Sequence, residues 1–592
     1  MSRAPFRRLA AVIAAVMVGL AACSQGGGVS ATGSTPGTTS FPTTAVPTTT
    51  TAPPPIFCLQ TEYGPAAAAD EVLRVPGGDP VAASVVFSSD TFACAADAVV
   101  VSSDDLEQVA LAARLAAALH GPLLFGGSAP SPALGAELAR LIPQRVWLVG
   151  GVVVPALPEG SEIERLDGDR AALADAIDEV VGGNPALTLP TGGGPDLVAV
   201  AVQAMAERAA LAPSPPTTAT TTGASVTSTT APEEEVPAEE EPLPIVVAGS
   251  GERGVAWLVA ADEPALALAA AAAAVPSGSL MALVDGSDLR RVPEVARALR
   301  DSGDGARVIR LVGDITTDAS WQLPLLLEGE ELPGGGYLLF PGRRLVALYG
   351  HSWAPELGVL AEQPPDEAAR LAAALAADYA EEGVVVVPAF EIIATVADSR
   401  AGEDGDYSNE SPVDDIRPWI EAAGASGLYV LLDLQPGRSD FLSQALLYEE
   451  FLRLPHVGLA LDPEWRLGPD EFHLQQFGSV PAAEVNEVAE WLAGLVREEH
   501  LPQKMLLLHQ FRLSMIPDRE AVAVPGELAL VIQMDGQGAL ADKYATWEAI
   551  TAGTEEAGWF WGWKNFYDED SPMATPAEVL ALEPRVVYVS YQ

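Results

Sequence analysis

The chain has 592 residues, of which 49% are hydrophobic, so it is long enough to form two or three folded units. It carries 81 Asp and Glu residues against 32 Lys and Arg, a formal net charge of −49. Without a local basic run, such a chain offers no surface for the phosphate backbone of nucleic acids, and we expect no nucleic-acid partner. The acidic surplus indicates a well-solvated surface and names no substrate.

Residues 1–22 have the organisation of a bacterial export signal. Three arginines precede an apolar stretch, residues 9–19, that is too short to span a bilayer, and the sequence LAAC then ends at Cys23. This pattern resembles the lipobox of bacterial lipoproteins. The resemblance implies cleavage before Cys23 and acylation of its thiol, with palmitate-type chains that anchor the protein in the lipid bilayer. We therefore expect the protein on the outer face of the cytoplasmic membrane, at the cell surface.

Residues 23–55 are predicted to be a disordered tether, because Gly, Ser, Thr and Pro dominate them and cannot form a core. Two cysteines remain after this segment, Cys58 and Cys94. Both lie at the start of the first folded unit and in an oxidising compartment, so we predict that they form a disulfide.

Residues 56–180 and 181–335 share a pattern of apolar strands that alternate with Ala-rich helices, which predicts two small parallel α/β modules. The second contains a Thr/Pro and acidic insertion, residues 212–242, that we expect to be disordered.

The first module carries GPLLF at residues 121–125, LVGG at 148–151 and LDGDR at 166–170. These motifs resemble the cell-wall-binding repeat type 2 family. The resemblance implies non-covalent binding to anionic polymers of the cell wall. An alternative remains open, in which the modules only pack against the domain that follows.

Residues 344–592 have the length and the alternation of strands and helices expected of a (β/α)8 TIM barrel without its last helix. Eight apolar strands are predicted, starting at Leu345, Val384, Leu428, Val457, Lys504, Leu528, Gly558 and Val586. Helical stretches are predicted between them, including a short one near residue 515. The fold class is therefore α/β, with two repeat modules followed by a barrel.

Nearly every predicted strand ends in polar residues, where the functional face of a barrel lies. The residues that we expect to gather there are His351, Glu391, Asp433, Gln435, Asp462, Glu464, His509, Gln533, Asp535 and Lys564. Buried polar groups need partners to offset their desolvation, so such a ring indicates a ligand site. For some of these residues a structural role is an alternative to ligand binding: His351 or His509 alone could be structural, and Lys564 could be an ion-pair partner of Asp535.

Asp462, Pro463 and Glu464 at the fourth strand, followed by Trp465, resemble the strand-four motif of TIM-barrel glycosidases of glycoside hydrolase families 18 and 25. The resemblance implies that Glu464 donates a proton and that Asp462 orients it. Such cleavage needs a second carboxylate that stays charged. Asp535 and Asp433 are the candidates for this nucleophile or water-activating base.

The remaining candidate residues are expected to bind the substrate. They are His351, Glu391, Gln435, Trp465, His509, Gln533, Lys564 and Trp561. No HExxH motif, Gly-rich phosphate loop or GxSxG elbow occurs, so we expect neither a metal nor a cofactor. The sequence thus predicts an envelope lipoprotein whose barrel binds, and in its catalytic version hydrolyses, a glycan. The alternative is a non-catalytic surface protein or scaffold that the repeats hold to the cell wall.

Overall fold

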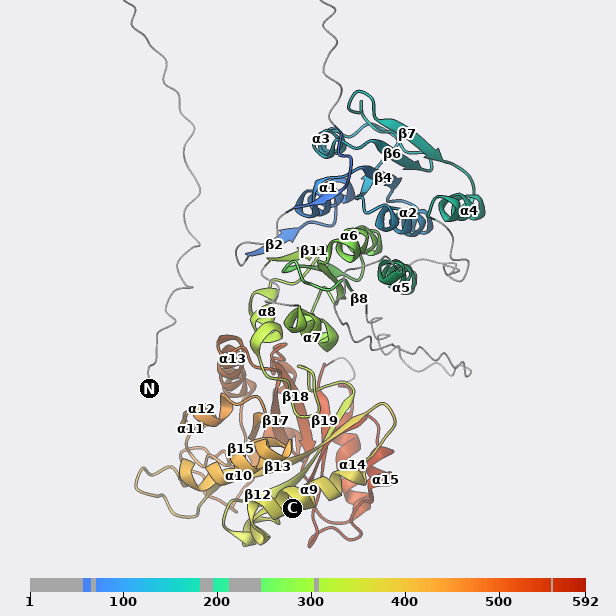
Figure 1. Cartoon of the computed structure of the whole chain (residues 1–592). Helices are drawn as coiled ribbons and strands as arrows, with labels where there is room; N and C mark the ends of the chain where they lie inside the picture. The colour runs from blue at the N-terminus through green and yellow to red at the C-terminus, as the bar shows by residue number, and fades with distance from the viewer. Residues whose placement is uncertain (1–56, 65–70, 182–194, 212–245, 303–307, 555–556) are drawn as a thin grey trace, which may run out of the picture. The chain divides into compact units, whose positions relative to one another are not determined.

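The computed structural model describes residues 57–64, 71–181, 195–211, 246–302, 308–554 and 557–592 (Figure 1). The expected signal peptide, Cys23, the tether and the acidic insertion lie outside these ranges. Within them, no helix combines the length and the apolar character needed to cross a membrane.

The first α/β segment contains a parallel four-stranded sheet with the order β5-β4-β6-β7. Its strands are β4 (Asp97–Ser102), β5 (Leu123–Gly126), β6 (Arg145–Val149) and β7 (Glu162–Leu166). Its helices are α1 (Pro80–Thr91), α2 (Leu106–Ala118), α3 (Pro132–Leu141) and α4 (Arg170–Val181). Asp105 and Ser131 cap the amino termini of α2 and α3 with their side chains, so the sequence itself sets where these helices begin.

The second segment contains a five-stranded sheet with the order β2-β11-β9-β10-β8, parallel except for β8. Its strands are β2 (Glu71–Val75), β8 (Val247–Ala248), β9 (Val255–Ala260), β10 (Leu280–Val284) and β11 (Val308–Val312). Its helices are α5 (Pro195–Leu211), α6 (Pro264–Ser277), α7 (Pro293–Asp301) and α8 (Ala319–Glu328). Strand β2 comes from the start of the chain and pairs with β11, so the two α/β segments are interleaved. Their kinship as repeats and their boundary at residue 180 stay predictions.

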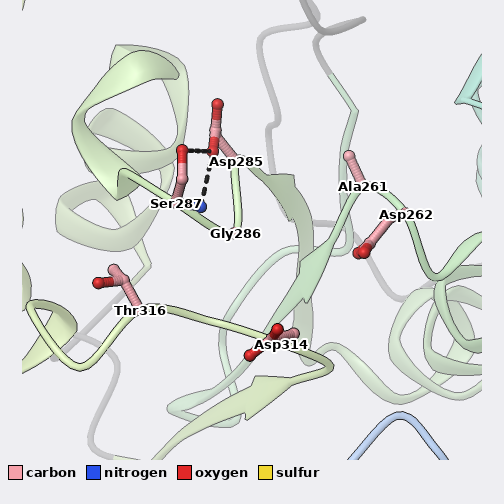
Figure 2. Close-up of a pocket in the computed structure, with 7 residues that line it drawn as sticks. All are labelled: Ala261, Asp262, Asp285, Gly286, Ser287, Asp314 and Thr316. Atoms are coloured by element: carbon pink, nitrogen blue, oxygen red, sulfur yellow. Dashed lines mark hydrogen bonds between the residues drawn. The ribbon is translucent and has the colours of Figure 1, made fainter.

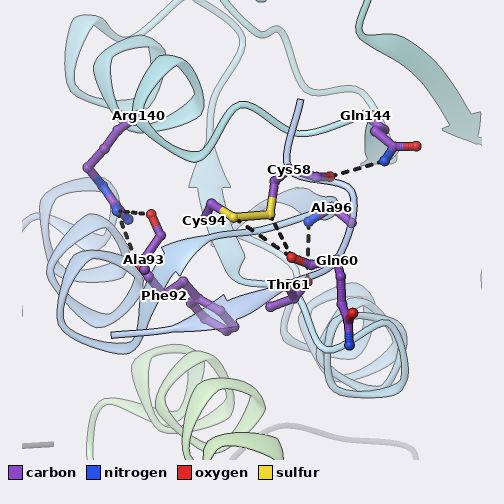
Figure 3. Close-up of a disulfide and its surroundings, with 9 residues drawn as sticks. All are labelled: Cys58, Gln60, Thr61, Phe92, Ala93, Cys94, Ala96, Arg140 and Gln144. Atoms are coloured by element: carbon purple, nitrogen blue, oxygen red, sulfur yellow. Dashed lines mark hydrogen bonds between the residues drawn. A yellow bond between two sulfur atoms is a disulfide. The ribbon is translucent and has the colours of Figure 1, made fainter. Parts of the chain in front are cut away.

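A disulfide joins Cys58 to Cys94, whose Cα atoms are 5.8 Å apart (Figure 3). Beside it, β1 (Glu62–Tyr63) pairs with β3 (Phe92–Cys94). The Gln144 side chain donates a hydrogen bond to the Cys58 carbonyl at 3.1 Å. These contacts fix the first described residues to the four-stranded α/β segment.

The carboxy-terminal part is a closed barrel of eight parallel strands, as the sequence predicted (yellow to red in Figure 1). The strands are β12 (Arg343–His351), β13 (Val385–Ala397), β15 (Tyr429–Leu434), β16 (Val457–Leu461), β17 (Lys504–Gln510), β18 (Leu528–Met534), β19 (Phe560–Asn565) and β20 (Val586–Tyr591). Strand β12 pairs with both β13 and β20, which closes the sheet. The short β14 (Ser408–Glu410) runs antiparallel to the end of β13.

Helices follow most of the barrel strands. They are α9 (Pro365–Ala377), α10 (Val413–Ser426), α11 (Phe441–Leu447), α12 (Glu449–Leu452), α13 (Ala482–Glu498), α14 (Leu540–Thr551) and α15 (Pro576–Leu580). Near residue 515 the structure has two 3-10 turns, Leu513–Met515 and Arg519–Ala521, in place of the helix that we expected. The lack of a last helix stays a prediction.

Alternation along the strands divides the barrel into two layers. The even-numbered residues Val346, Val430 and Leu432 belong to the large core between strands and helices. Their odd-numbered neighbours Ala347, Tyr429 and Leu431 fill the barrel interior with apolar side chains. Because side chains two apart share a face, the inward positions further along each strand are placed over this floor.

Candidate active site

A layer of polar side chains lies above the apolar floor, at the carboxyl ends of the barrel strands. Its members from successive strands are Tyr349, Glu391, Asp433, Asp462, His509, Gln533, Lys564 and Ser590, and all are almost completely buried. Each is two residues beyond an interior position of its own strand, so the same alternation that builds the floor brings these groups together. The structure thus assembles most of the ring that the sequence predicted.

His509 is at the centre of this layer. Its Nε2 atom lies 2.9 Å from Glu391 Oε1 and 3.5 Å from Asp433 Oδ1, and its Nδ1 atom lies 3.0 Å from Asp535 Oδ2. Burial lowers the pKa of His509, but the three carboxylates outweigh burial and raise this pKa well above its usual 6.5. The carboxylates on both edges of His509 therefore favour its protonated form.

Lys564 and Tyr349 complete a loop of contacts around the interior. Lys564 Nζ lies 3.2 Å from Asp535 Oδ1 and 3.4 Å from the centroid of the Tyr349 ring. The Tyr349 hydroxyl donates to Asp433 Oδ2 at 2.9 Å. Both roles considered for Lys564 are therefore met, since it contacts Asp535 and also belongs to the ring.

Two further hydrogen bonds connect this layer to residues of β20. The Tyr588 hydroxyl donates to Glu391 Oε2 at 2.8 Å, and Gln533 Nε2 donates to the Ser590 hydroxyl at 2.6 Å. The buried Gln533 Oε1 atom has no hydrogen-bond partner among the described residues. A buried amide oxygen without a partner is costly, so this atom is available to a hydroxyl group of a ligand.

Asp462 and Glu464 are held at the end of β16 by a 3-10 turn, Pro463–Trp465. Asp462 Oδ1 accepts a hydrogen bond from the Glu464 backbone N–H at 3.2 Å, which fixes where the Glu464 side chain starts. Burial raises the pKa of Asp462 well above its usual value. Burial, and after it the negative charge of Asp535, raises the pKa of Glu464 to about 7.

The pKa of Asp535 is shifted in the opposite direction. Burial acts to raise its pKa, but Lys564 and His509 together lower the pKa of Asp535 below its usual 3.8. Near neutral pH this mouth therefore presents a protonatable carboxyl at Glu464 and an ionised carboxylate at Asp535. This is the arrangement in which one carboxyl gives a proton while another keeps its charge.

Some candidate residues lie at the edge of this arrangement or outside it. Gln435 accepts a hydrogen bond from the Ala397 N–H and reaches the Tyr349 hydroxyl at 3.5 Å. His351 contacts the Ser411 hydroxyl at 3.0 Å, away from the carboxylates. Trp465 packs against His473, with ring centroids 5.5 Å apart.

Trp561 faces the outside of the barrel. Its ring packs against Trp547 of α14, with centroids 5.8 Å apart, and belongs to the core between strands and helices. The residue that points inward on this part of β19 is Gly562, followed by Lys564. Trp561 and Lys564 are three residues apart, so the alternation of side chains along β19 places them on opposite faces.

Tyr588 was absent from the sequence prediction, although it contacts Glu391 directly. Its signal is the same alternation, since it precedes Ser590 by two residues on β20. Arg512, whose charge lowers the pKa of Glu464, was also absent. It follows the end of β17 on a loop, where no periodicity indicates side-chain direction.

Four exposed aromatic side chains belong to segments that follow the carboxyl ends of barrel strands. They are Trp353, Phe472, Phe477 and Tyr567, and between 41% and 66% of each is exposed. Among the described residues no other large aromatic side chain is as exposed. Flat apolar faces around a polar centre suit sugar rings, which have both apolar faces and hydroxyl edges.

Two other acidic groups lie outside the barrel interior. Asp404, Asp406 and Glu410 bring carboxylate oxygens within 4.8 Å of one another near β14, in a geometry that could hold a cation. A pocket of about 730 Å³ lies at the carboxyl ends of β9, β10 and β11 (Figure 2). Its lining residues are Ala261, Asp262, Asp285, Gly286, Ser287, Asp314 and Thr316. Asp285 is already engaged there by the Ser287 N–H at 2.7 Å.

No protein-family model matches the sequence, and no curated protein matches it. Among solved structures, the chain is similar to Cwp6 from Clostridium difficile, at 11% identity and a TM-score of 0.30, over 63% of this chain and 66% of that chain. It is also similar to Cwp8 from Clostridium difficile, at 12% identity and a TM-score of 0.25, over 44% of this chain and 52% of that chain. The chain therefore spans less than two thirds of either protein, and at these TM-scores neither similarity carries a functional conclusion.

Proposed function

We propose that the barrel binds a glycan at its carboxyl-terminal mouth and hydrolyses it by acid and base catalysis. Glu464 is the proton donor, and Asp535 is the nucleophile or the base that activates water. The observation that carries this proposal is that the two carboxyls have different surroundings at one mouth: His509 and Lys564 lie 3.0 Å and 3.2 Å from Asp535, whereas burial dominates at Glu464, so that their pKa values are displaced in opposite directions. Glycosidic bonds are cleaved by carboxyl pairs of this kind, one neutral and one charged.

The other members of the ring support these two residues. Asp462 fixes the backbone of Glu464, and burial raises the pKa of Asp462. Asp433 is a less suitable nucleophile than Asp535, because it is completely buried and accepts the Tyr349 hydrogen bond. Glu391 and His509 are positioning residues that act through Asp535.

The experiment measures glycan cleavage and glycan binding separately. Release of reducing ends from a set of bacterial envelope polysaccharides is compared for the full chain, Glu464→Gln and Asp535→Asn. Both variants should lose about 10²- to 10⁴-fold in rate and keep binding, because only charge and proton transfer are removed. Glu356→Gln is the matched control, since Glu356 is an exposed carboxyl on a loop of the same face. Full activity of Glu464→Gln would contradict the proposal.

A non-catalytic role is the second candidate. It is favoured by the buried contacts that His509 makes with Glu391, Asp433 and Asp535, since such a network could be a self-contained polar plug. In this version the mouth only binds saccharide, and the α/β segments contact polymers of the cell wall. A wild-type chain that binds envelope glycans and cleaves none of them would favour this version.

We further propose that the protein is a lipoprotein, acylated on Cys23 at the outer face of the cytoplasmic membrane. The lipobox-like sequence before Cys23 supports this, and the Cys58–Cys94 disulfide is compatible with an oxidising compartment. Cells fed with labelled palmitate should incorporate the label into the wild-type chain and not into Cys23→Ser. Equal label in both would contradict acylation at this residue.

A further inference from the structure

Two arginines flank Glu464 along the rim of the barrel. Arg438 follows β15 and Arg512 follows β17, and both strands are direct neighbours of β16, whose end carries Glu464. A polymer that lies across the mouth at Glu464 would therefore meet one arginine on each side of the bond that is cleaved. Neither arginine is needed for the proton transfers proposed above.

Each guanidinium lies over aromatic rings of the rim. The Arg438 guanidinium carbon is 4.2 Å from the ring centroid of Tyr407 and 4.9 Å from that of Phe472. The Arg512 guanidinium carbon is 4.1 Å from the ring centroid of Phe477. Stacking holds each planar group in place without consuming its in-plane N–H donors. Arg438 uses part of its donors on the Glu471 carbonyl, at 2.7 Å.

The described residues offer these two arginines no ion-pair partner. Within the described ranges, no carboxylate lies at ion-pair distance from Arg438 or Arg512, although the chain carries a net charge of −49. Six other arginines of the barrel pair with carboxylates, namely Arg344, Arg417, Arg453, Arg466, Arg497 and Arg585, whereas no ion pair within the described part of the chain is found for Arg343, Arg370, Arg400 and Arg519. What distinguishes Arg438 and Arg512 is their position on either side of the strand that carries Glu464, where two positive charges suit an anionic ligand.

Building on the proposed function, we infer that the substrate is an acidic glycan, whose sugars on either side of the cleaved bond carry carboxylates that bind Arg438 and Arg512. The carboxylates of the barrel interior would repel an acidic group at the centre, so the charged sugars belong at the flanks.

Binding is measured with the full chain carrying Glu464→Gln, so that no probe is consumed. The probes are oligosaccharides of galacturonate and of mannuronate, each paired with its carboxyl-reduced form, which has the same linkages and ring stereochemistry with a neutral hydroxymethyl group in place of each carboxylate. At least one acidic probe should bind about tenfold more tightly than its reduced form, as expected for charge-assisted hydrogen bonds. The preference should fall as salt is added.

The double variant Arg438→Gln, Arg512→Gln should abolish this preference, while Arg370→Gln should retain it. Arg370 is an exposed arginine on the outer helix α9, so its loss removes the same kind of charge away from the mouth. Equal binding of acidic and reduced probes, a preference that survives in the double variant, or no binding of any acidic probe would overturn the inference. Hydrolysis of neutral glycans that depends on Glu464 would leave the proposed function intact while this inference fails.

Discussion

At the scale of single residues, ionisation at the mouth is controlled by a few contacts shorter than 4 Å. Asp535 lies between the imidazolium of His509, at 3.0 Å, and the ammonium of Lys564, at 3.2 Å. Among the described residues, no cation lies within ion-pair distance of Glu464, and burial is the largest cause of its raised pKa. Two carboxyls of the same mouth therefore titrate far apart, because their nearest partners differ.

This separation predicts a bell-shaped pH dependence of kcat/KM for glycan hydrolysis. Activity should fall as the pH rises through about 7, where Glu464 loses its proton, and should fall in acid only below the usual Asp range, because Asp535 resists protonation. The measurement is the initial rate over the whole pH range at limiting substrate. A rate that continues to rise above neutrality would exclude Glu464 as the proton donor.

Lys564→Met should move both limbs of this profile to higher pH. Lys564 lowers the pKa of Asp535 and also that of Glu464, so its removal should raise both pKa values. Comparison of the variant profile with that of the wild type measures the two displacements. Unchanged limbs would show that Lys564 only packs against Tyr349.

How far the sequence predicts these residues depends on regular alternation. Glu391, Asp433 and His509 were found because each continues the inward face of an apolar strand. Trp561 was placed at the mouth because aromatic character was weighed above alternation, yet its side chain faces α14. His351 contacts Ser411, a residue of the loop that follows β14, and such a long-range contact leaves no local trace in the sequence.

At the scale of elements, the barrel interior leaves little space for side chains. Gly458 on β16 illustrates this, since a Cβ atom there would lie 2.7 Å from the Tyr429 hydroxyl and 2.8 Å from the Met505 carbonyl oxygen. Ala460, two residues further along β16, belongs to the apolar cluster of the interior. Small side chains in the floor allow the larger polar side chains above them to meet.

Gly458→Ala should therefore destabilise the barrel, by about 1–3 kcal/mol, because the neighbouring atoms must shift. Gly494→Ala is a suitable control, since a Cβ atom at this helical position meets nothing within 4 Å. It should stabilise the protein by about 0.5–1 kcal/mol through helix propensity. Chemical denaturation of the two variants measures both changes, and equal stabilities would contradict this account of the interior.

The barrel strands could be predicted because each is an apolar run followed by polar residues. The segment after β17 could not, because its apolar residues lie in 3-10 turns that share the composition of a short helix. The pairing of β2 with β11 was also beyond prediction. It joins segments from opposite ends of the α/β region, and nothing in either segment specifies a partner so distant in sequence.

At the scale of the whole molecule, the described part of the chain begins at a covalent link. The Cys58–Cys94 disulfide fixes the first described residues to the four-stranded α/β segment, and the Cys58 N–H also donates to the Ile142 carbonyl at 3.0 Å. A mechanical force applied to the chain before Cys58 would therefore be transmitted directly to this segment.

Replacing both cysteines by serine should lower the free energy of unfolding of this segment by about 2–4 kcal/mol, mainly because the unfolded chain gains freedom. Denaturation followed by near-ultraviolet circular dichroism, with and without reductant, measures the loss. Reductant should destabilise the wild-type chain and leave the double variant unchanged. A wild-type chain that reductant leaves unchanged would indicate that the link has no part in stability.

The proposed mechanism requires that Glu464 and Asp535 differ in ionisation state near neutral pH. The most direct measurement is a pH titration of carboxyl ¹³C chemical shifts in the full chain, with Glu464→Gln and Asp535→Asn used to assign the two signals. We predict that the Glu464 signal titrates near pH 7 and that the Asp535 signal stays in its ionised position below pH 3.8. Two signals that titrate together at ordinary carboxyl pKa values would contradict the account.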